Sequence, residues 1–324
     1  MSRGLGLILL FFGIMMPAAD WPQWRGPNRD GKSAETGLLG AWPKGGPPLL
    51  WKAQGLGEGY SGPAVVGDRI YLQGQQRGKE FVIACDAHSG HELWKTPAGA
   101  RFNNENGNGP RGTPAVDGNR LYVEAADGTL VCLETATGVR VWGLNFAERF
   151  KARVPPWGYS ESPLVEGDRV IVTPGGPGAA VVALNKTTGE LIWQSQSDAA
   201  GYSSPVAFDA GGTRALAVFT ANGTIGLEMK DGKLLWRYDG VINPRCNIAT
   251  PVVGSGHVFV STEYGTGCAL LRITTDGAKI KASEVYHNQA MRNHYSTSVL
   301  IGDYLYGYSG EILTAMNFMT GEVA

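Results

Sequence analysis

The 324-residue chain carries little charge. Only 18% of its residues are Asp, Glu, Lys or Arg, and its formal net charge is -1. Nucleic-acid binding requires a basic face, so nucleic acid is excluded as an expected partner. Helical periodicity is missing as well: apolar residues do not recur at a spacing of three to four positions. The sequence therefore predicts neither a helical bundle nor a basic recognition helix.

Long apolar runs are also missing. The longest, Leu5 to Met16, is short for a membrane-spanning helix. It follows Arg3 and precedes the small residues of "PAAD", which is the pattern of a secretory signal peptide. We therefore predict a signal peptide over residues 1–19 and a periplasmic or secreted protein without a transmembrane segment after cleavage. An uncleaved anchor is the alternative, because Pro17 is unfavourable near a cleavage site.

Cysteine is scarce, and its spacing matches no metal motif. The four cysteines are neither adjacent nor arranged as C-x-x-C, so we expect no metal site and four buried thiols. A disulfide between Cys246 and Cys268 is the weaker alternative, since an exported protein can form one.

Catalytic motifs are lacking too. The sequence contains no H-E-x-x-H, P-loop or Ser-His-Asp pattern, and the histidines at 88, 91, 257, 287 and 294 are scattered. The Gly-rich segment from Arg101 to Gly112 has no strand-to-helix context, so it does not predict a phosphate site. We expect it instead to cover the mouth of a channel.

Glycine and proline are abundant, with 47 and 18 residues, and they punctuate a repeat. The phrase "WGYSESPLVEGD" at Trp157 is echoed by "EGYSGPAVVGDR" at Glu58, "AGYSSPVAFDAG" at Ala200 and "CNIATPVVGSGH" at Cys246. Recurrence at this spacing indicates architecture first. In each copy the proline begins a strand, because it cannot donate a ladder hydrogen bond.

The firmest signal is a Gly followed four residues later by Trp. It occurs as Gly90 with Trp94, Gly138 with Trp142, Gly189 with Trp193 and Gly232 with Trp236. Each interval between these tryptophans holds about four short strand-like runs broken by tight turns. Four strands per repeat of about 40 to 50 residues predict the blades of a β-propeller. The large apolar indoles are expected to pack between neighbouring blades rather than to bind a cofactor.

This repeat resembles that of the PQQ-like β-propellers, which include quinoprotein dehydrogenases and outer-membrane assembly lipoproteins. The opening "DWPQWRGPNRDG" also resembles the mature N-terminus of secreted PQQ-like proteins of uncharacterised role. The resemblance implies an all-β fold on an eight-bladed template. We assign an N-terminal extension to residues 20–48 and the propeller to 49–324, with repeats near 60–95, 111–142, 159–194, 202–237, 247–286 and 295–324.

Two repeats depart from the pattern. In the fifth, Lys281 stands where the Trp is expected, so that blade must be sealed differently. The sixth ends at Ala324, one residue before its expected Trp, which favours a C-terminally truncated propeller with an open arc of about six blades. The segment around Trp51 is predicted to be an orphan outer strand. In the alternative, residues 49–53 pair beside Ile312–Phe318 and close a six-bladed ring.

The segments before the inner strands converge near the propeller axis, and they supply the candidate ligand-binding residues. These are Tyr60, Arg111, Tyr159, Glu161, Tyr202, Arg245, Asn247, His294 and Tyr295. The simpler interpretation is that Tyr and Ser recur there because the repeat duplicated its turn chemistry. The functional interpretation depends on Arg111, Glu161, Arg245 and His294, which interrupt that chemistry on a face where propellers bind ligands. It predicts that Arg111, Tyr159, Glu161, Tyr202 and His294 share one funnel.

Two functions remain open. One is a binding or scaffold module for a protein or a small molecule, without bound quinone. The other is a quinoprotein oxidoreductase acting on an alcohol or a sugar, which would need PQQ, a calcium ion and a carboxylate base. The resemblance adds an adjacent cysteine pair to many such enzymes, and this chain has none. Glu161 and Asn247 alone are too few to hold calcium, which takes six or more oxygens, so we prefer the scaffold.

Overall fold

The structure is a computed structural model that describes residues 19–277 and 279–324. The predicted signal peptide lies outside this range except for Ala19. Within the described residues, helices long and apolar enough to cross a membrane are absent.

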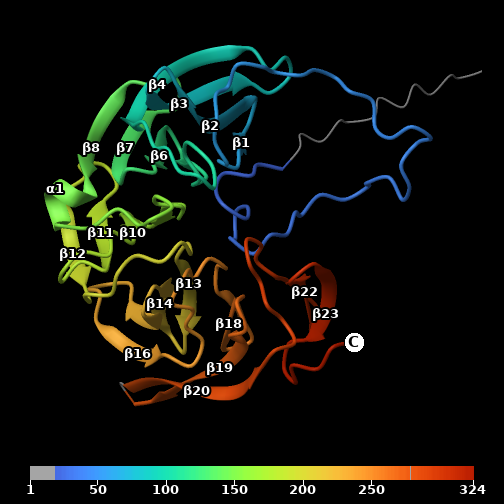
Figure 1. Cartoon of the computed structure of the whole chain (residues 1–324), viewed down its shortest axis with the longest axis vertical. Coiled ribbons are helices and arrows are strands. Elements are labelled where there is room, and N and C mark those ends of the chain that lie inside the picture. Colours follow the sequence, from blue (N-terminus) through green and yellow to red (C-terminus); the bar gives the residue numbers. More distant parts are fainter. Residues whose placement is uncertain (1–18, 278) are drawn as a thin grey trace, which may run out of the picture.

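The chain folds into six antiparallel sheets that follow one another along the sequence (Figure 1). Five have four strands and the last has three, and in each sheet neighbouring strands are consecutive in sequence. We number the sheets blade 1 to blade 6. They radiate around a common centre and form an open arc, which confirms the predicted all-β propeller fold.

The strands follow the predicted repeats closely. Blades 1 to 3 contain β1 (Ala64–Val66), β2 (Arg69–Gln76), β3 (Lys79–Asp86), β4 (Glu92–Ala100), β5 (Ala115–Asp117), β6 (Arg120–Glu124), β7 (Thr129–Glu134), β8 (Arg140–Asn145), β9 (Leu164–Glu166), β10 (Arg169–Val172), β11 (Val181–Asn185) and β12 (Leu191–Ser195). Blades 4 to 6 contain β13 (Val206–Ala210), β14 (Thr213–Thr220), β15 (Gly223–Glu228), β16 (Leu234–Tyr238), β17 (Val252–Gly254), β18 (His257–Thr262), β19 (Gly267–Asp276), β20 (Lys279–Asn288), β21 (Val299–Ile301), β22 (Tyr304–Ser309) and β23 (Ile312–Asn317). One short helix, α1 (Phe146–Phe150), links blades 2 and 3.

The inner strands of blades 1 to 5 each begin directly after a proline, as predicted. These prolines are Pro63, Pro114, Pro163, Pro205 and Pro251. Because the ring nitrogen has no hydrogen, it ends the ladder at the first residue of the strand. The repeated proline therefore fixes where each inner strand starts.

Neighbouring blades are held together by apolar layers between their sheets. Between blades 2 and 3, for example, Tyr122 and Leu130 pack with Val170 and Leu184, and Phe146 of α1 joins them. Similar clusters fill the other interfaces between consecutive blades. Burial of these faces is the main favourable contribution to the fold.

Three tryptophans lie on a glycine turn of the next blade. The pairs are Trp94 with Gly138, Trp142 with Gly189 and Trp193 with Gly232. A Cβ atom added to Gly138 would lie 2.5 Å from the Trp94 ring, so only glycine leaves room for the indole. Each indole N–H also donates to a backbone carbonyl of the same turn, for Trp94 that of Thr135 at 3.1 Å.

The fifth blade replaces the contact between tryptophan and glycine turn with another one, which the Gly-to-Trp spacing did not predict. Its outer hairpin is long, with ten residues in each of β19 and β20. Among the described residues, none beyond the chain neighbours of Gly277 has an atom within 4 Å of its Cβ position, so Trp236 does not cover this turn. Trp236 is instead buried among apolar side chains of blades 4 and 5. Tyr286, paired with Leu270 beside a bulge, occupies the position of the other tryptophans, and its hydroxyl donates to Phe318 O at 3.0 Å. Lys281 is an exposed hairpin residue.

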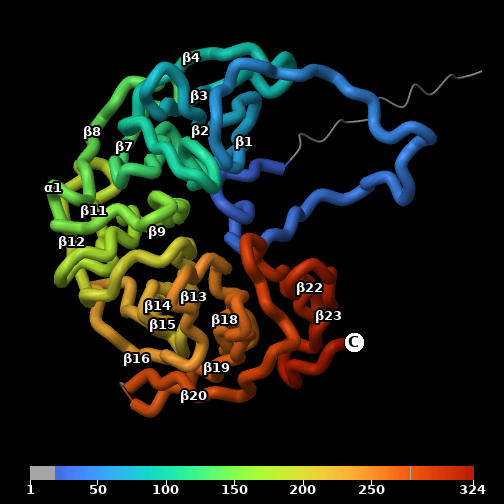
Figure 2. The backbone as a smooth tube through the Cα atoms, viewed as in Figure 1, coloured from blue at the N-terminus to red at the C-terminus, as the bar shows by residue number. Residues whose placement is uncertain are grey.

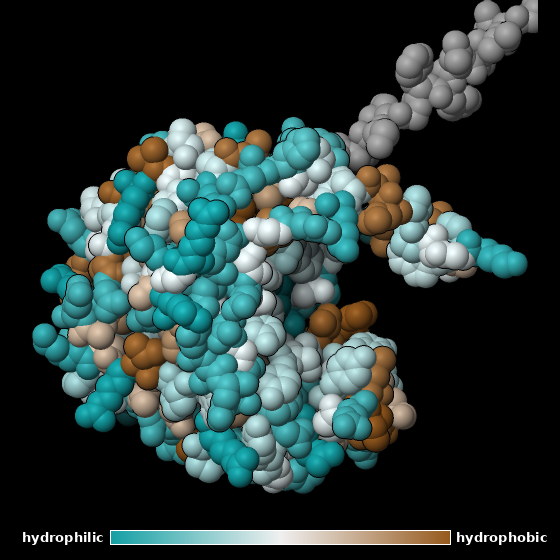
Figure 3. All heavy atoms as spheres, turned by 45° about the horizontal axis from the view of Figure 1, so that its top comes forward, coloured by the Kyte–Doolittle hydropathy of each residue, from teal (hydrophilic) through white to brown (hydrophobic). Residues whose placement is uncertain are grey.

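The segment around Trp51 contacts blade 1 rather than blade 6. Its indole covers Gly90, while β23 pairs with β22 and Met316 pairs with Val323. In the described chain, residues 49–53 form no ladder with β23, so the six-bladed closed ring is wrong. The gap between the first and last blades is visible as a notch in Figure 3, with hydrophobic side chains on its wall.

The face of blade 6 that borders this notch is uncovered. Leu313 is 65% exposed there, whereas Leu130, at the same register of blade 2, is fully buried. Likewise Tyr306 is exposed and Tyr122 is buried. The difference is the neighbouring sheet, because blade 3 covers blade 2.

Residues 20–31, which we call the strap, run along the inner side of the arc (Figure 2). Trp21 pairs with Val65 of β1, and the Pro22 carbonyl accepts a hydrogen bond from Val116 of β5 at 2.8 Å. The strap then continues toward blades 5 and 6. It is thus part of the folded propeller rather than a separate extension.

Candidate functional site

The candidate residues lie at one end of the propeller, which we call the upper face. It is formed by the segments that enter the inner strands and by the turns between second and third strands. Hydroxyl groups link these segments from blade to blade: Ser162 Oγ accepts from Thr113 N at 2.9 Å, and Ser204 Oγ accepts from Ser162 N at 2.9 Å. Thr297 Oγ1 accepts from Thr250 N in the same way. The repeated Ser and Thr thus satisfy buried backbone groups, as the simpler interpretation predicted.

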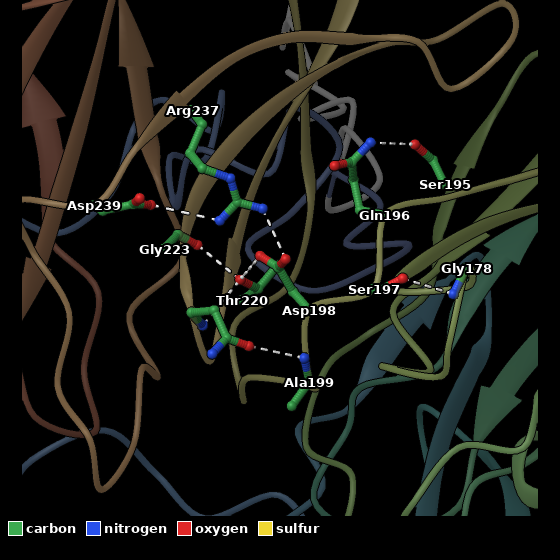
Figure 4. A network of polar contacts seen from close by, with 11 residues as sticks. Gly178, Ser195, Gln196, Ser197, Asp198, Ala199, Thr220, Gly223, Arg237 and Asp239 are labelled. Carbon is green, nitrogen blue, oxygen red and sulfur yellow. Dashed lines mark hydrogen bonds and ion pairs between the residues drawn. The ribbon is translucent and has the colours of Figure 1, made fainter.

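A polar network fixes the upper face between blades 3 and 4 (Figure 4). Asp198 accepts from Thr220 Oγ1 and pairs with Arg237, both at 2.7 Å. The hydrogen bond to Asp198 raises the pKa of Arg237. Because the charges satisfy each other, the network holds the entering segment against the β14–β15 turn, and its arginine is not offered to a ligand.

Glu161 lies in the interior rather than in an open funnel. It is 2% exposed, and one carboxylate oxygen accepts a hydrogen bond from the Thr173 amide. Burial raises the pKa of Glu161 to about 7, opposed by the Thr173 hydrogen bonds and the positive charge of Arg29. Glu124 is equally buried, and burial followed by the charge of Glu161 raises its pKa well above the usual range. The two form a buried carboxyl pair.

A third buried carboxyl group lies in the first blade. Glu80 has one oxygen bonded to the Ala126 amide at 2.9 Å, and burial raises its pKa to about 7. The positive charge of Arg111 partly opposes this shift. Sequence reasoning missed Glu80 and Glu124, since both sit in ordinary strand positions.

Three other candidates also have structural roles. Tyr159 is buried against Phe146, and its hydroxyl donates to Pro174 O at 2.8 Å. Asn247 is buried, accepting from Asn243 N at 3.0 Å and donating to Thr220 O at 2.9 Å. Tyr202 is nearly buried beneath Trp157. Of the five residues predicted to share one funnel, Tyr159, Glu161 and Tyr202 are buried. Arg111 and His294 are partly exposed. The difference was not predicted, because hydroxyl spacing does not reveal which way a side chain points.

Two groups of candidates do reach the surface. In the first cluster, the Arg111 guanidinium carbon lies 5.8 Å from the ring centre of Tyr60 and 5.0 Å from that of Phe102. Its guanidinium also donates to Gly107 O at 2.7 Å, which fixes its position. Tyr60 is 64% exposed and forms the outer surface of this cluster. The Arg101–Gly112 segment that carries Phe102 thus lies over blade 1.

The second cluster lies on blades 5 and 6. Arg245 is 5.2 Å from the ring centre of Tyr264, whose hydroxyl lies 2.8 Å from His294 Nε2. Tyr295 stacks on His294 at 3.7 Å and is 78% exposed. Burial lowers the pKa of His294, opposed by the charge of Glu263. In the described chain Arg245 makes no ion pair, so its charge faces solvent on an aromatic base.

Tyr264 and Phe102 are members of these clusters that sequence reasoning did not select. Tyr264 lies in the β18–β19 turn with a left-handed backbone, φ 61°. A bulky residue with positive φ is unusual and marks a site where the surroundings impose the conformation. The signal is in the backbone and not in the residue spacing.

The interior does not fit PQQ with calcium. Of the two residues considered for calcium, Asn247 is engaged in internal hydrogen bonds. Glu161 uses one oxygen for the Thr173 amide, and its other oxygen has no hydrogen-bond partner and lies beside the carboxyl group of Glu124. The described residues contain no group of three or more His, Cys, Asp or Glu side chains suited to a metal ion. The strap also lies along the inner strands, where the sheets converge. All four cysteines are buried thiols, so the proposed Cys246–Cys268 bridge is not formed.

The repeat and its docking turns match a known family. The sequence profile of the outer membrane protein assembly factor BamB family matches residues 36–149 and 78–324. The chain belongs to this family. The solved structure of BamB from Moraxella catarrhalis superimposes with a TM-score of 0.58 at 16% identity, covering 85% of this chain and 76% of that one. This similarity supports the propeller fold alone.

The chain is similar to an assembly factor and to a dehydrogenase, which correspond to the two functions considered. The BamB of Burkholderia pseudomallei is 28% identical over 312 residues, covering 79% of this chain and 74% of that protein. Quinohemoprotein alcohol dehydrogenase ADH IIB of Pseudomonas putida is 31% identical over 120 residues, which cover 35% of this chain but 17% of that enzyme. The BamB match spans most of both chains, and the enzyme match is confined to a short portion of the enzyme.

Proposed function

We propose that this chain is an exported protein-binding scaffold of the BamB family that works without a bound quinone. The observation that carries the proposal is the second cluster: an unpaired arginine on a tyrosine base, next to stacked and exposed rings. Aromatic residues and arginine are the side chains most enriched at the centres of protein interfaces.

The chemistry of this cluster favours a partner segment that combines a carboxylate with an aromatic or apolar side chain. The Arg245 guanidinium offers several donors in one plane, which suits a carboxylate, while Tyr264 and Tyr295 offer apolar ring faces. The relatives' name, assembly factor for outer membrane proteins, supports a protein partner and an envelope location. The N-terminal signal pattern supports export.

A capture experiment tests the proposal. The tagged chain and its Arg245→Glu/Tyr295→Ala variant are exported in the native host, and the bound proteins are compared by quantitative mass spectrometry. We expect one or a few envelope proteins to be lost with the variant and retained with Lys44→Glu/Trp42→Ala, a matched change in the exposed 36–50 segment. Equal recovery with both variants would refute the assigned surface.

A second arm separates the scaffold from an oxidoreductase. PQQ and calcium are added to the purified protein, and quinone absorbance and dye-linked alcohol oxidation are followed after removal of unbound PQQ. We expect no retained quinone and no turnover, because the described residues contain no cluster of side chains suited to hold the calcium ion that PQQ requires. Clear turnover would contradict the proposal.

A further inference from the structure

The motif "WPQWRGPNR" of the strap is explained by what its side chains contact. Trp24 Nε1 donates to Thr250 Oγ1 of blade 5 at 3.0 Å. Together with Trp21 and Pro22, which bond to β1 and β5, this gives the strap partners in blades 1, 2 and 5. These partners are 44 to 226 residues away in sequence.

Arg25 attaches the strap to blade 6. Its guanidinium donates to Ser298 O at 2.8 Å and to Thr297 O at 3.2 Å, both just before β21. It also donates to the strap carbonyls of Arg29 and Asp30, which holds the strap in a compact turn. Burial lowers the pKa of Arg25 to about 10, opposed by the charge of Asp30. The group stays protonated at neutral pH.

Arg29 attaches the strap to blade 3. It is 4% exposed, and it donates to Ser162 O at 2.9 Å and to Pro163 O at 3.1 Å, at the start of β9. Burial lowers the pKa of Arg29 to about 9, and the negative charge of Glu161 opposes this effect. The two arginines therefore contact equivalent positions of two blades, the Ser or Thr turn before an inner strand.

We propose that the segments entering the inner strands form a binding site for an arginine-bearing peptide, and that the strap of the same chain fills this site. These segments present backbone carbonyl oxygens at Ser162, Pro163, Thr297 and Ser298. Carbonyl oxygens accept hydrogen bonds without contributing a full charge, and a planar guanidinium can donate to two of them at once. Lysine has a compact ammonium and cannot reproduce this geometry.

Because the strap is covalently linked to the propeller, it occupies the site in preference to a free peptide. A covalently linked segment competes at an effective concentration in the millimolar range for short flexible linkers. A free peptide therefore gains access only when the strap's own contacts are weakened. Residues of the strap belong to neither of the two surface clusters, so the strap contacts support this proposal separately from the proposed function.

The test uses the full chain with Arg25→Ala and Arg29→Ala together, and a synthetic peptide of residues 20–31. We expect the variant to melt at a lower temperature, and the peptide to raise its Tm in a concentration-dependent way, since a ligand of the native state stabilises it. The Tm of the unsubstituted chain should not change, because its site is filled. A peptide with lysine at both arginine positions should raise the Tm of the variant far less.

A folded variant whose Tm does not respond to the peptide would overturn the proposal. So would an equal response to the lysine peptide. If the double variant does not fold, hydrogen exchange on the unsubstituted chain decides the matter. The amides of Val65 and Val116, which donate to Trp21 O and Pro22 O, should exchange as slowly as the β6–β7 ladder, and exchange at the rate of an unstructured segment would contradict strap binding.

Discussion

The indole of Trp51 covers the turn at Gly90, and its Nε1 donates to Ala87 O at 3.0 Å. This is the contact that Trp94 makes with the Gly138 turn of blade 2. Trp51 therefore makes the contact with blade 1 that an outer-strand tryptophan of a neighbouring blade would make. The docking contact is thus a property of the Gly turn and the indole, and it forms without a complete sheet behind the tryptophan.

This relationship predicts that the docking glycines are sensitive for two reasons. Gly138 has a φ of 71°, and a Cβ there would overlap the Trp94 ring. Gly118 also has positive φ, 57°, but has open space around its Cβ position. We expect Gly118→Ala to cost about 1–2 kcal/mol in unfolding free energy from backbone strain, and Gly138→Ala to cost clearly more. Urea unfolding of both variants measures the difference, and equal losses would show that the indole contact contributes nothing.

The tryptophans themselves give a matched pair. Trp193 is buried between blades 3 and 4, whereas Trp42 is 71% exposed. We expect Trp193→Ala to lower the unfolding free energy by about 3–5 kcal/mol, the usual range for deleting a buried aromatic. Trp42→Ala should leave it nearly unchanged. A Trp193→Ala melting curve that overlays that of the original chain would rule out the docking role.

The uncovered face of blade 6 supplies a third comparison. Leu130 and Leu313 occupy the same register of their blades, yet only Leu130 is covered by a neighbouring sheet. Leu130→Ala should cost about 2–5 kcal/mol. Leu313→Ala should cost little, since its side chain remains in solvent. Thermal unfolding of the purified variants tests this, and similar losses at both positions would mean that the face is covered in solution.

The buried carboxyl groups predict how stability depends on pH. Burial raises the pKa values of Glu80 and Glu161 to about 7, and it raises the pKa of Glu124 well above its usual range. In the unfolded chain these groups ionise at the usual glutamate values, so the native state binds more protons between those values and the raised ones. Their contribution is complete at low pH and is lost as pH rises through about 7. We therefore expect these groups to lower the unfolding free energy between about pH 5 and about pH 8.

Glutamine substitution isolates this contribution. Glu124→Gln removes one titrating group of the pair, so the decline of stability with rising pH should become shallower. Glu105→Gln, at an exposed position of the Arg101–Gly112 segment, should leave the profile unchanged. Identical profiles for Glu124→Gln and the unsubstituted chain would contradict the assignment.

Much of the fold follows from the sequence because its signals are local. The Gly-to-Trp spacing and the strand-starting prolines located five of the six blades within a few residues. The sequence did not reveal the role of Tyr286. Counting four residues from Gly277 leads to Lys281, since the Gly-to-Trp spacing applies only to a short hairpin and the β19–β20 hairpin is long. Local spacing cannot reveal such an extension.

The candidate site was harder to predict because its contacts are distant in sequence. Arg29 bonds to carbonyls 133 and 134 residues away, and Arg25 to carbonyls 272 and 273 residues away. Tyr159 and Tyr295 come from similar Tyr-containing segments, yet Tyr159 is in the core and Tyr295 is 78% exposed. The repeat fixes where these segments lie, and packing decides which side chains face solvent.

The most direct measurement of the scaffold proposal is site-specific photo-cross-linking in the native host. A photoreactive phenylalanine analogue replaces Tyr295 on the second cluster, and Val139, an exposed residue in the β7–β8 turn at the other end of blade 2, serves as the control. The account predicts discrete adducts with a partner protein from Tyr295, weakened by Arg245→Glu, and none from Val139. Equal adduct yields at Tyr295 and Val139, or no adduct at Tyr295, would contradict it.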